Sequence, residues 1–138
     1  MSDKTLSDLA EKMSEIDIAM LMTRTDGGAI AGRPMSNNGD VEYDGDSYYF
    51  TWDDSRMVED IEADATVSLA FQGDDMFMVA VQGKAEIVRD KAAFEEHWNP
   101  DLDEWFEDGI DTDGVVMIKV SATRVHYWDG EEDGEIKL

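Results

Sequence analysis

The stretch TVSLAFQGDDMFMVAVQGKAEIVR, residues 66–89, decides the fold class of this chain. In residues 66–72 the side chains of Val67, Leu69 and Phe71 share one face, an alternation that is typical of a half-buried strand. Residues 72–75, QGDD, have the composition of a tight turn, and the run 76–89 that follows reads as a second strand. That run is too long for one flat strand, so we expect Gly83 to bend it. A tight turn between two strands predicts an antiparallel hairpin.

A similar pattern precedes this hairpin. In residues 16–25, IDIAMLMTRT, the side chains of Ile18, Met20 and Met22 lie on one face of a strand and those of Ala19 and Leu21 on the other. Because both faces are apolar, we expect this strand to be buried on both sides. The sequence DGG at 26–28 predicts a hairpin turn into another strand.

The remaining elements follow from periodicity and from capping residues. Further strands are predicted at 29–36, 47–52 and 115–128, with a loop at 37–40, an extended pair at Val41 and Tyr43, and a turn at Asp44-Gly45. A first helix is predicted near 6–16, with Ser2 or Thr5 as its cap. A second is predicted at 56–63, with Asp53, Asp54 or Ser55 as its cap. A third is predicted at 91–98, followed by a turn or short helix at 101–108. The acidic tail 129–138 is expected to be solvated or frayed.

These elements predict a single domain over residues 1–138, mainly β in an α+β arrangement. Its six antiparallel strands are expected to close into a small barrel with short peripheral helices, because closure removes exposed strand edges. The alternative is a flat sheet that helices cap on one side.

The charge of the chain excludes several classes of partner. Lys and Arg number 11 against 34 Asp and Glu, a net charge of −23, so nucleic acid and anionic membranes are disfavoured. The chain has no cysteine and no long apolar run, which predicts a cytoplasmic protein without disulfides or thiolate zinc sites. Concentrated salt screens the self-repulsion of such a surface, so we expect a halophilic protein rather than an ordinary acidic one.

Metal and catalytic motifs are weak. The run from Asp40 to Gly45 begins like a calcium loop, but Thr51 stands where a bidentate Glu is needed. Phe106 occupies the required glycine position of a similar run that begins at Asp101. His97 and His126 are the only histidines, they form no metal motif, and no serine lies in a G-x-S-x-G elbow. The sequence therefore predicts no metal site and nominates no catalytic residue.

The scarce cations point instead to an anion site. Arg56 directly follows Ser55 at the start of a predicted helix, where free N–H groups and the helix dipole favour phosphate. The guanidinium of Arg56 can donate two parallel hydrogen bonds to such a phosphate, and the hydroxyl of Ser55 can donate another. Residues 49–52, YFTW, lead into this site and suit a flat phosphorylated ring system such as a flavin or nucleotide. The alternative is that Arg56 pairs with surface acids and that the aromatic side chains are ordinary strand residues.

Several blocks in order along the chain resemble the general stress protein branch of the pyridoxamine 5′-phosphate oxidase-like superfamily. They are GRPM (32–35), DGDSYYFTWDDSRMVEDI (44–61), VSLAF (67–71), QGKAEIVRDKAAFEEHWNP (82–100), WFEDG (105–109) and VHYWDG (125–130). The resemblance implies a split β-barrel that binds FMN or FAD, in a homodimer with the flavin at the subunit interface. Flavin contacts are implied at ten positions: Arg33, Pro34, Met35, Phe50, Thr51, Ser55, Arg56, Gln72, Trp98 and Trp105.

The sequence departs from this family at two points. Met57 stands where many relatives carry a second cation after the Ser-Arg pair, which weakens the expected phosphate site. The chain ends in DGEIKL rather than in a basic segment, so pyridoxamine phosphate oxidation itself is not expected.

Three functions remain open at the level of sequence. The first is flavin-dependent redox chemistry, with a nicotinamide nucleotide as a transient reductant, since the chain has no G-x-G-x-x-G fingerprint. The second is a non-enzymatic flavin-binding or sensing module. The third is a split barrel that uses a deazaflavin or haem.

Overall fold

The computed structural model describes residues 4–36, 43–98 and 100–138, so the expected loop at 37–40, Val41 and the cap candidate Ser2 lie outside the described residues. The strands are β1 (Ile18–Arg24), β2 (Ile30–Ser36), β3 (Asp46–Trp52), β4 (Thr66–Gln72), β5 (Phe77–Val88), β6 (Val115–Asp129) and β7 (Glu132–Lys137). The α-helices are α1 (Leu6–Met13), α2 (Arg56–Ala63) and α3 (Lys91–Glu95), and short 3₁₀ turns are η1 (Asp26–Gly28), η2 (Pro100–Glu104) and η3 (Gly109–Asp111).

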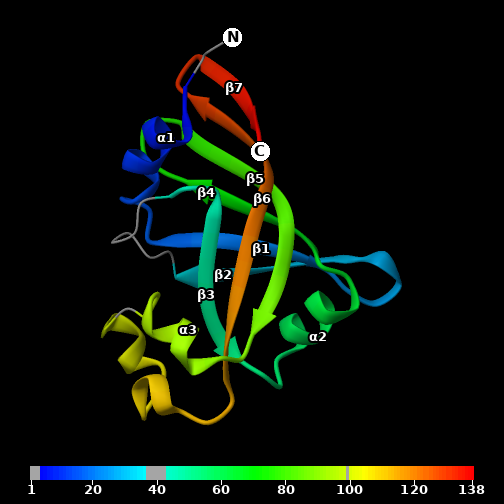
Figure 1. The fold of residues 1–138 in the computed structure, drawn as a ribbon. Coiled ribbons are helices and arrows are strands. Elements are labelled where there is room, and N and C mark those ends of the chain that lie inside the picture. The colour runs from blue at the N-terminus through cyan, green and yellow to red at the C-terminus, as the bar shows by residue number, and fades with distance from the viewer. Residues whose placement is uncertain (1–3, 37–42, 99) are drawn as a thin grey trace.

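One antiparallel sheet curls into a half-barrel, as expected for the split-barrel class (Figure 1). Its strand order is β2-β1-β4-β5-β6-β3, with β7 paired to β6 beyond this path. Strands β2 and β3 are therefore the two edge strands of this order, and within the described residues they are not hydrogen-bonded to each other. This unpaired seam is where the barrel is split.

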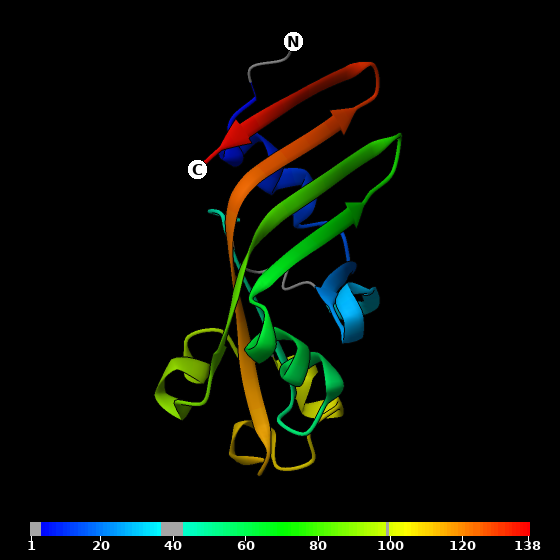
Figure 2. The same cartoon turned by 90° about the vertical axis from the view of Figure 1, so that its right-hand side faces the viewer.

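The hairpin predicted at 66–89 forms as expected. Thr66 pairs with Lys84 and Gln72 with Met78, so β4 and β5 are in continuous antiparallel register. Between β5 and β6 the register shifts at Gln82/Gly83, a bulge at the glycine expected to bend the strand. Figure 2 shows both long strands changing direction about halfway along their length.

The tail is the main departure from the predicted elements. Residues 132–137 were expected to be solvated or frayed, but they form β7, a seventh strand where six were predicted. β7 pairs with β6 from Arg124↔Lys137 to Asp129↔Glu132. Backbone pairing along a well-ordered neighbour overrides the polar composition of this segment, and Ile136 packs against the main core.

The main core fills the concave side of the sheet. Four strands contribute side chains that are at most 1% exposed: Leu21 of β1, Leu69 of β4, Val81 of β5, and Val125 and Tyr127 of β6. Helix α1 covers one end of the half-barrel, and Thr5 caps it with a reciprocal capping box, which confirms one of its two predicted caps. Helix α3 with η2 and η3 lies at the opposite end, as Figure 1 shows.

The convex face of β1 is exposed, so the prediction of a strand buried on both sides is wrong for the single chain. Ala19, Leu21 and Thr23 face the core, whereas Ile18 is 51% and Met20 39% exposed. Within the described residues, α3 and the 3₁₀ turns pack on β3 and β6, around Phe50, Phe94 and Phe106, and not on this part of the sheet.

Candidate functional site

A cleft of about 470 Å³ lies along the seam between the two unpaired strand edges, and we call it the seam cleft. Its lining comes from Asp17 and the start of β1, from residues 34–36 of β2 and from residues 48–52 of β3. His97, Leu102, Trp105 and Phe106 complete it. The volume lies in the range typical of small-molecule sites. Because β2 and β3 are not paired here, their edges border the cleft directly.

Aromatic side chains form most of one wall of the seam cleft. The strand β3 alternates so that Tyr48, Phe50 and Trp52 face the α3 side, opposite Lys119, Met117 and Val115 of β6. Phe50 meets Trp98 edge-on with 4.8 Å between ring centroids, and Trp52 lies 5.0 Å from Phe106. This network packs the rings firmly, and it leaves Trp52 42% and Trp105 71% exposed at the cleft rim.

A stacked pair, Tyr48 and His97, lies at the cleft. Their ring centroids are 3.5 Å apart and their planes differ by only 10°. The Nδ1 atom of His97 is buried and has no hydrogen-bond partner among the described residues, and Nε2 lies 3.9 Å from Glu96. Burial raises the pKa of the Tyr48 phenol, so this hydroxyl remains a neutral donor at physiological pH.

The predicted anion site at the start of α2 has the expected local geometry. Ser55 is the N-cap, and its Oγ accepts the N–H of Val58 at 3.3 Å. The Ser55 N–H donates to the carbonyl of Trp52 at 3.0 Å, which ties the helix start to the end of β3 and so to the cleft rim. Met57, the residue after Arg56, is 2% exposed in the main core and adds no charge to the site.

Arg56 itself points toward the β1–β2 turn. Its Nη2 donates to Asp26 Oδ2 at 2.6 Å and its Nε to Thr25 Oγ1 at 3.2 Å. The side chain of Arg56 remains 60% exposed. The pairing of Arg56 with a surface acid, the alternative stated from sequence, is therefore present in the structure.

Arg33 lies on the concave face of β2 and approaches α2. Its Nη2 is 3.9 Å from Oδ2 of Asp60, a carboxylate that is only 8% exposed. Thr23 Oγ1 donates to the same carboxylate at 3.3 Å. Both arginines of the predicted phosphate site are thus next to carboxylates of the chain itself.

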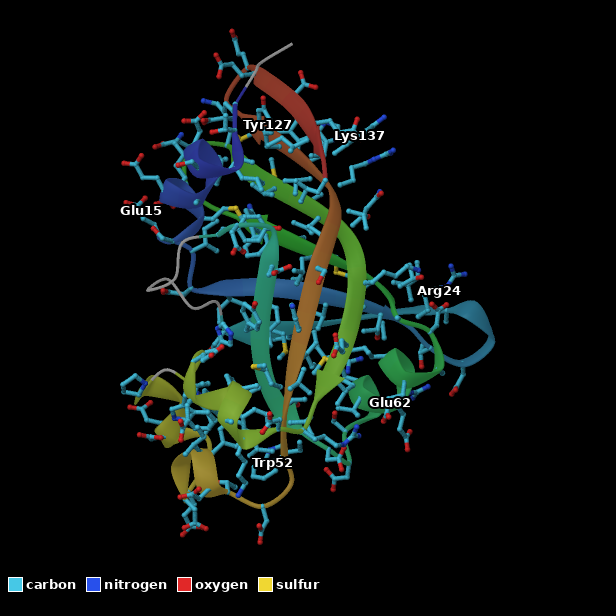
Figure 3. The ribbon with its side chains drawn as sticks, in the orientation of Figure 1. Glu15, Arg24, Trp52, Glu62, Tyr127 and Lys137 are labelled. Carbon is cyan, nitrogen blue, oxygen red and sulfur yellow. The ribbon has the colours of Figure 1, made fainter. Side chains whose placement is uncertain are left out.

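A second, polar cavity of about 800 Å³ lies between the β1–β2 turn and α2, and we call it the polar groove. Its lining includes Arg24 and Arg56 together with Asp26, Asp54 and Asp60. Figure 3 shows Arg24 on the same side of the molecule as Glu62 of α2. Arg24 Nε lies 3.7 Å from Asp64 Oδ2.

The structure brings together half of the ten residues named from sequence. The seam cleft gathers Pro34, Met35, Phe50, Thr51 and Trp105. Ser55 and Arg56 lie at the start of α2, with Arg56 in the polar groove, and Arg33 approaches Asp60 in the middle of the helix.

Two named residues lie elsewhere. Gln72 is exposed at the end of β4 and borders neither cavity. Trp98 packs behind the cleft, where its indole N–H donates to Asp103 at 3.0 Å. Sequence reasoning missed Tyr48 and His97 as cleft residues. The alternation of Tyr48 with Phe50 and Trp52 predicts a shared face, but the approach of His97 depends on how α3 packs.

Within residues 4–36, 43–98 and 100–138, no group of three or more His, Cys, Asp or Glu side chains is arranged to hold a metal ion. In the same part of the chain, no helix has the length and apolar character needed to cross a membrane.

Comparison with known proteins agrees with this architecture. The family model described as "pyridoxamine 5′-phosphate oxidase like" matches residues 4–138. The chain belongs to the pyridoxamine 5′-phosphate oxidase-like family. The family resemblance carried by the quoted blocks is thereby confirmed. No curated protein sequence matches the chain.

Solved structures of the same fold include two general stress proteins. A Clostridium acetobutylicum protein related to general stress protein 26 of the pyridoxinephosphate oxidase family superposes with a TM-score of 0.84 at 22% identity, covering 100% of this chain and 97% of that one. General stress protein 26 from Bacillus anthracis superposes with a TM-score of 0.76 at 21% identity, covering 92% of this chain and 93% of that one. A heme binding protein from Mycobacterium smegmatis superposes with a TM-score of 0.75 at 15% identity, covering 99% of this chain and 60% of that one.

Proposed function

We propose that this family member binds a flavin, FMN or FAD, with the ring system in the seam cleft and the phosphate at the start of α2. The observation that carries the proposal is the aromatic cleft between the unpaired edges of β2 and β3, whose rim is joined to the α2 N-terminus by the Ser55–Trp52 hydrogen bond. A flat ring suits the aromatic walls, and a phosphate suits the free N–H groups of the helix start.

The residues present fit such a ligand in size and polarity. Pro34 and Met35 on one edge and Phe50 and Thr51 on the other provide apolar surface and backbone polar groups around the ring position. Arg56, with its exposed guanidinium, supplies the positive charge that a phosphate needs near a body of net charge −23. When bound, the flavin supplies hydride or electron transfer, while the protein orients it and controls its electrostatic surroundings.

We further propose that two copies of the chain associate through the convex face of the sheet, which we call the bare face. The strand registers place the following side chains on it: Ile18, Met20, Met22, Gly32, Pro34, Ser36, Ser68, Ala70, Gln72, Met78, Ala80, Gln82, His126 and Trp128. None of these residues is acidic, although Asp and Glu make up 34 of the 138 residues. On the neighbouring β7 the register adds Asp133 and Glu135 to the same side, opposite Trp128 and His126.

A face poor in acidic side chains is where two molecules that each carry −23 can touch with less repulsion. The acidic residues that border it, Asp133 and Glu135 on β7, lie at its β7 edge. Ile18, Pro34 and Ser36 belong to the bare face and also line the seam cleft. A second copy on this face therefore borders the cleft, which supports a flavin site at the subunit interface.

Purification in molar KCl followed by dialysis tests flavin binding directly. We expect a flavin absorbance spectrum, and mass spectrometry of the denatured sample distinguishes FMN from FAD. A protein that stays colourless and gains no thermal stability from either compound contradicts the proposal. Turnover with a reduced nicotinamide nucleotide then separates a redox enzyme from a flavin-binding or sensing module.

Haem is the second candidate, and a specific residue favours it. His97 lies in the seam cleft, and imidazole is a common axial ligand of haem iron. One solved structure of the same fold is a heme binding protein. If haem is the ligand, the purified or reconstituted protein shows a Soret band that His97→Ala abolishes. A flavin spectrum that survives His97→Ala rejects this candidate.

A further inference from the structure

The β1–β2 turn is built to present one carboxylate to Arg56. The Thr25 N–H donates to the carbonyl of Ala29 at 2.8 Å, and the Gly28 N–H donates to Thr25 at 2.9 Å. Gly27 and Gly28 have φ of 70° and 86°, a conformation that only glycine adopts readily. These features hold Thr25 and Asp26 side by side at the tip of the hairpin.

Arg56 meets this turn with two of its donors. Nη2 contacts Asp26 Oδ2 and Nε contacts Thr25 Oγ1, at 2.6 and 3.2 Å. The Asp26 carboxylate is otherwise open to solvent, with a side-chain exposure of 92%. Helix α2 and β1 are packed against each other, so the two partners are held in register by the fold and not by a flexible loop.

We propose that Asp26 is an affinity-determining residue that competes with the ligand phosphate for the guanidinium of Arg56. This inference rests on the proposed phosphate site at the start of α2. The Asp26 carboxylate and the Thr25 hydroxyl occupy Nη2 and Nε of Arg56, the two donors that a bidentate contact with phosphate on this edge of the guanidinium would use. Arg56 must therefore leave Asp26 before it binds phosphate through this edge. Only a ligand that carries a phosphate gains from displacing Asp26.

An exposed pair of this kind is easily exchanged. Surface ion pairs contribute little to stability, whereas hydrogen bonds between charged groups and phosphate are stronger. Asp26 therefore lowers phosphate affinity modestly and does not block the site. Removing its charge makes the Arg56 guanidinium available without competition.

The test measures FMN and riboflavin affinities by fluorescence titration in molar KCl. We expect Asp26→Asn to tighten FMN binding by about two- to fivefold, which corresponds to about 0.4–1 kcal/mol. Riboflavin lacks the phosphate, so its affinity should not change. In a protein that already carries Arg56→Ala, Asp26→Asn should not change the affinity for FMN, because the guanidinium for which Asp26 and the phosphate compete is absent.

Asp54→Asn is the matched control, because Asp54 also lines the polar groove and loses the same charge. An equal gain in FMN affinity from Asp26→Asn and Asp54→Asn assigns the effect to overall charge and overturns the competition. A gain that persists in the Arg56→Ala background overturns it as well.

A second readout separates this inference from flavin binding itself. If neither the wild-type protein nor Asp26→Asn binds FMN, the proposed function fails. The competition is then judged by titrating inorganic phosphate while following the Nε–Hε resonance of Arg56 by NMR. That resonance should respond at lower phosphate concentration in Asp26→Asn, and an identical response in both proteins overturns the inference.

Discussion

Gly83 on β5 and Ser121 on β6 are in direct backbone contact: the carbonyl oxygen of Ser121 occupies the space that a Cβ at position 83 would need. This contact lies at the register shift between the two longest strands of the sheet. The shift bends both strands, which lets one sheet provide both the bare face and the wall of the seam cleft.

Gly83→Ala should therefore destabilise the protein. The added methyl group meets backbone rather than a movable side chain, and overpacking of this kind costs about 1–3 kcal/mol. Urea unfolding measures the loss. Gly32→Ala in β2 is the control, because its Cβ meets the Met22 side chain at an ordinary 3.4 Å. Equal losses in the two variants would contradict the role assigned to the bulge.

Arg56→Ala should weaken FMN binding by at least about tenfold, since loss of a charged hydrogen bond costs about 1.5–3 kcal/mol. Riboflavin affinity should remain unchanged. Arg24→Ala is the matched control, because Arg24 lines the same polar groove but pairs with Asp64. Unchanged FMN affinity in Arg56→Ala would mean that the phosphate binds elsewhere.

Met20→Glu should break the proposed dimer. Met20 lies in the middle of the bare face at 39% exposure, and association would bury one unpaired carboxylate from each copy. We expect the dissociation constant to rise by at least about 100-fold, measured by light scattering in molar KCl. Leu138→Glu, at an exposed apolar residue outside this face, should remain dimeric. A wild-type protein that is monomeric at micromolar concentration would refute the dimer.

Asp129→Asn should lower stability at neutral pH but not in acid. Two hydrogen bonds from Lys12 Nζ, at 2.8 and 2.9 Å, hold the pKa of the Asp129 carboxyl below its usual 3.8 and tie α1 to β6. A lowered pKa in the folded state contributes stability above the unfolded value, and this contribution is lost as pH falls below it.

The stability difference between wild type and Asp129→Asn should therefore be about 0.5–1 kcal/mol at pH 7 and should shrink as pH falls below 3.8. Thermal unfolding across this pH range measures it. Glu131→Gln in the turn after β6 is the charge-matched control, with little expected effect. A difference that is constant down to pH 2 would show that the Asp129 side chain acts by something other than its charge.

Added KCl should raise the melting temperature of the wild-type protein. The net charge of −23 opposes the compact state at low ionic strength, and molar salt shortens the Debye length to about 3 Å. Thermal scans between 0.1 and 3 M KCl test this expectation of a halophilic protein. A flat response would leave the excess of acidic residues without this explanation.

Much of the fold could be predicted because local patterns and tertiary packing agree. The hairpin at 66–89 formed with β4 at the predicted bounds and with the expected bend at Gly83. Helix α2 formed over 56–63 with Ser55 as its cap, because capping and amphipathic spacing are local properties. The prediction failed at 132–137, where a polar segment became β7 by pairing with β6.

The candidate site was predictable only in part. Residues near in sequence, such as Phe50 with Thr51 and Pro34 with Met35, were named together and lie together in the seam cleft. Gln72 was named from the family resemblance; it lies next to Phe71, the partner of Ala19, at the end of β4, and it is not among the residues that line the seam cleft. His97 was missed, because its stacking on Tyr48 depends on where α3 packs.

The amino-acid sequence alone determined six of the seven strands, the hairpin turn between β4 and β5, the cap of α2 and the family to which the chain belongs, because these depend on spacing and on conformational preferences of neighbouring residues. Only the tertiary structure decided that Arg56 meets Asp26, that β2 and β3 leave a seam, and that one apolar face of β1 stays exposed. Those relationships join residues about thirty positions apart or more, or depend on which surfaces the chain leaves uncovered, and no local pattern encodes either.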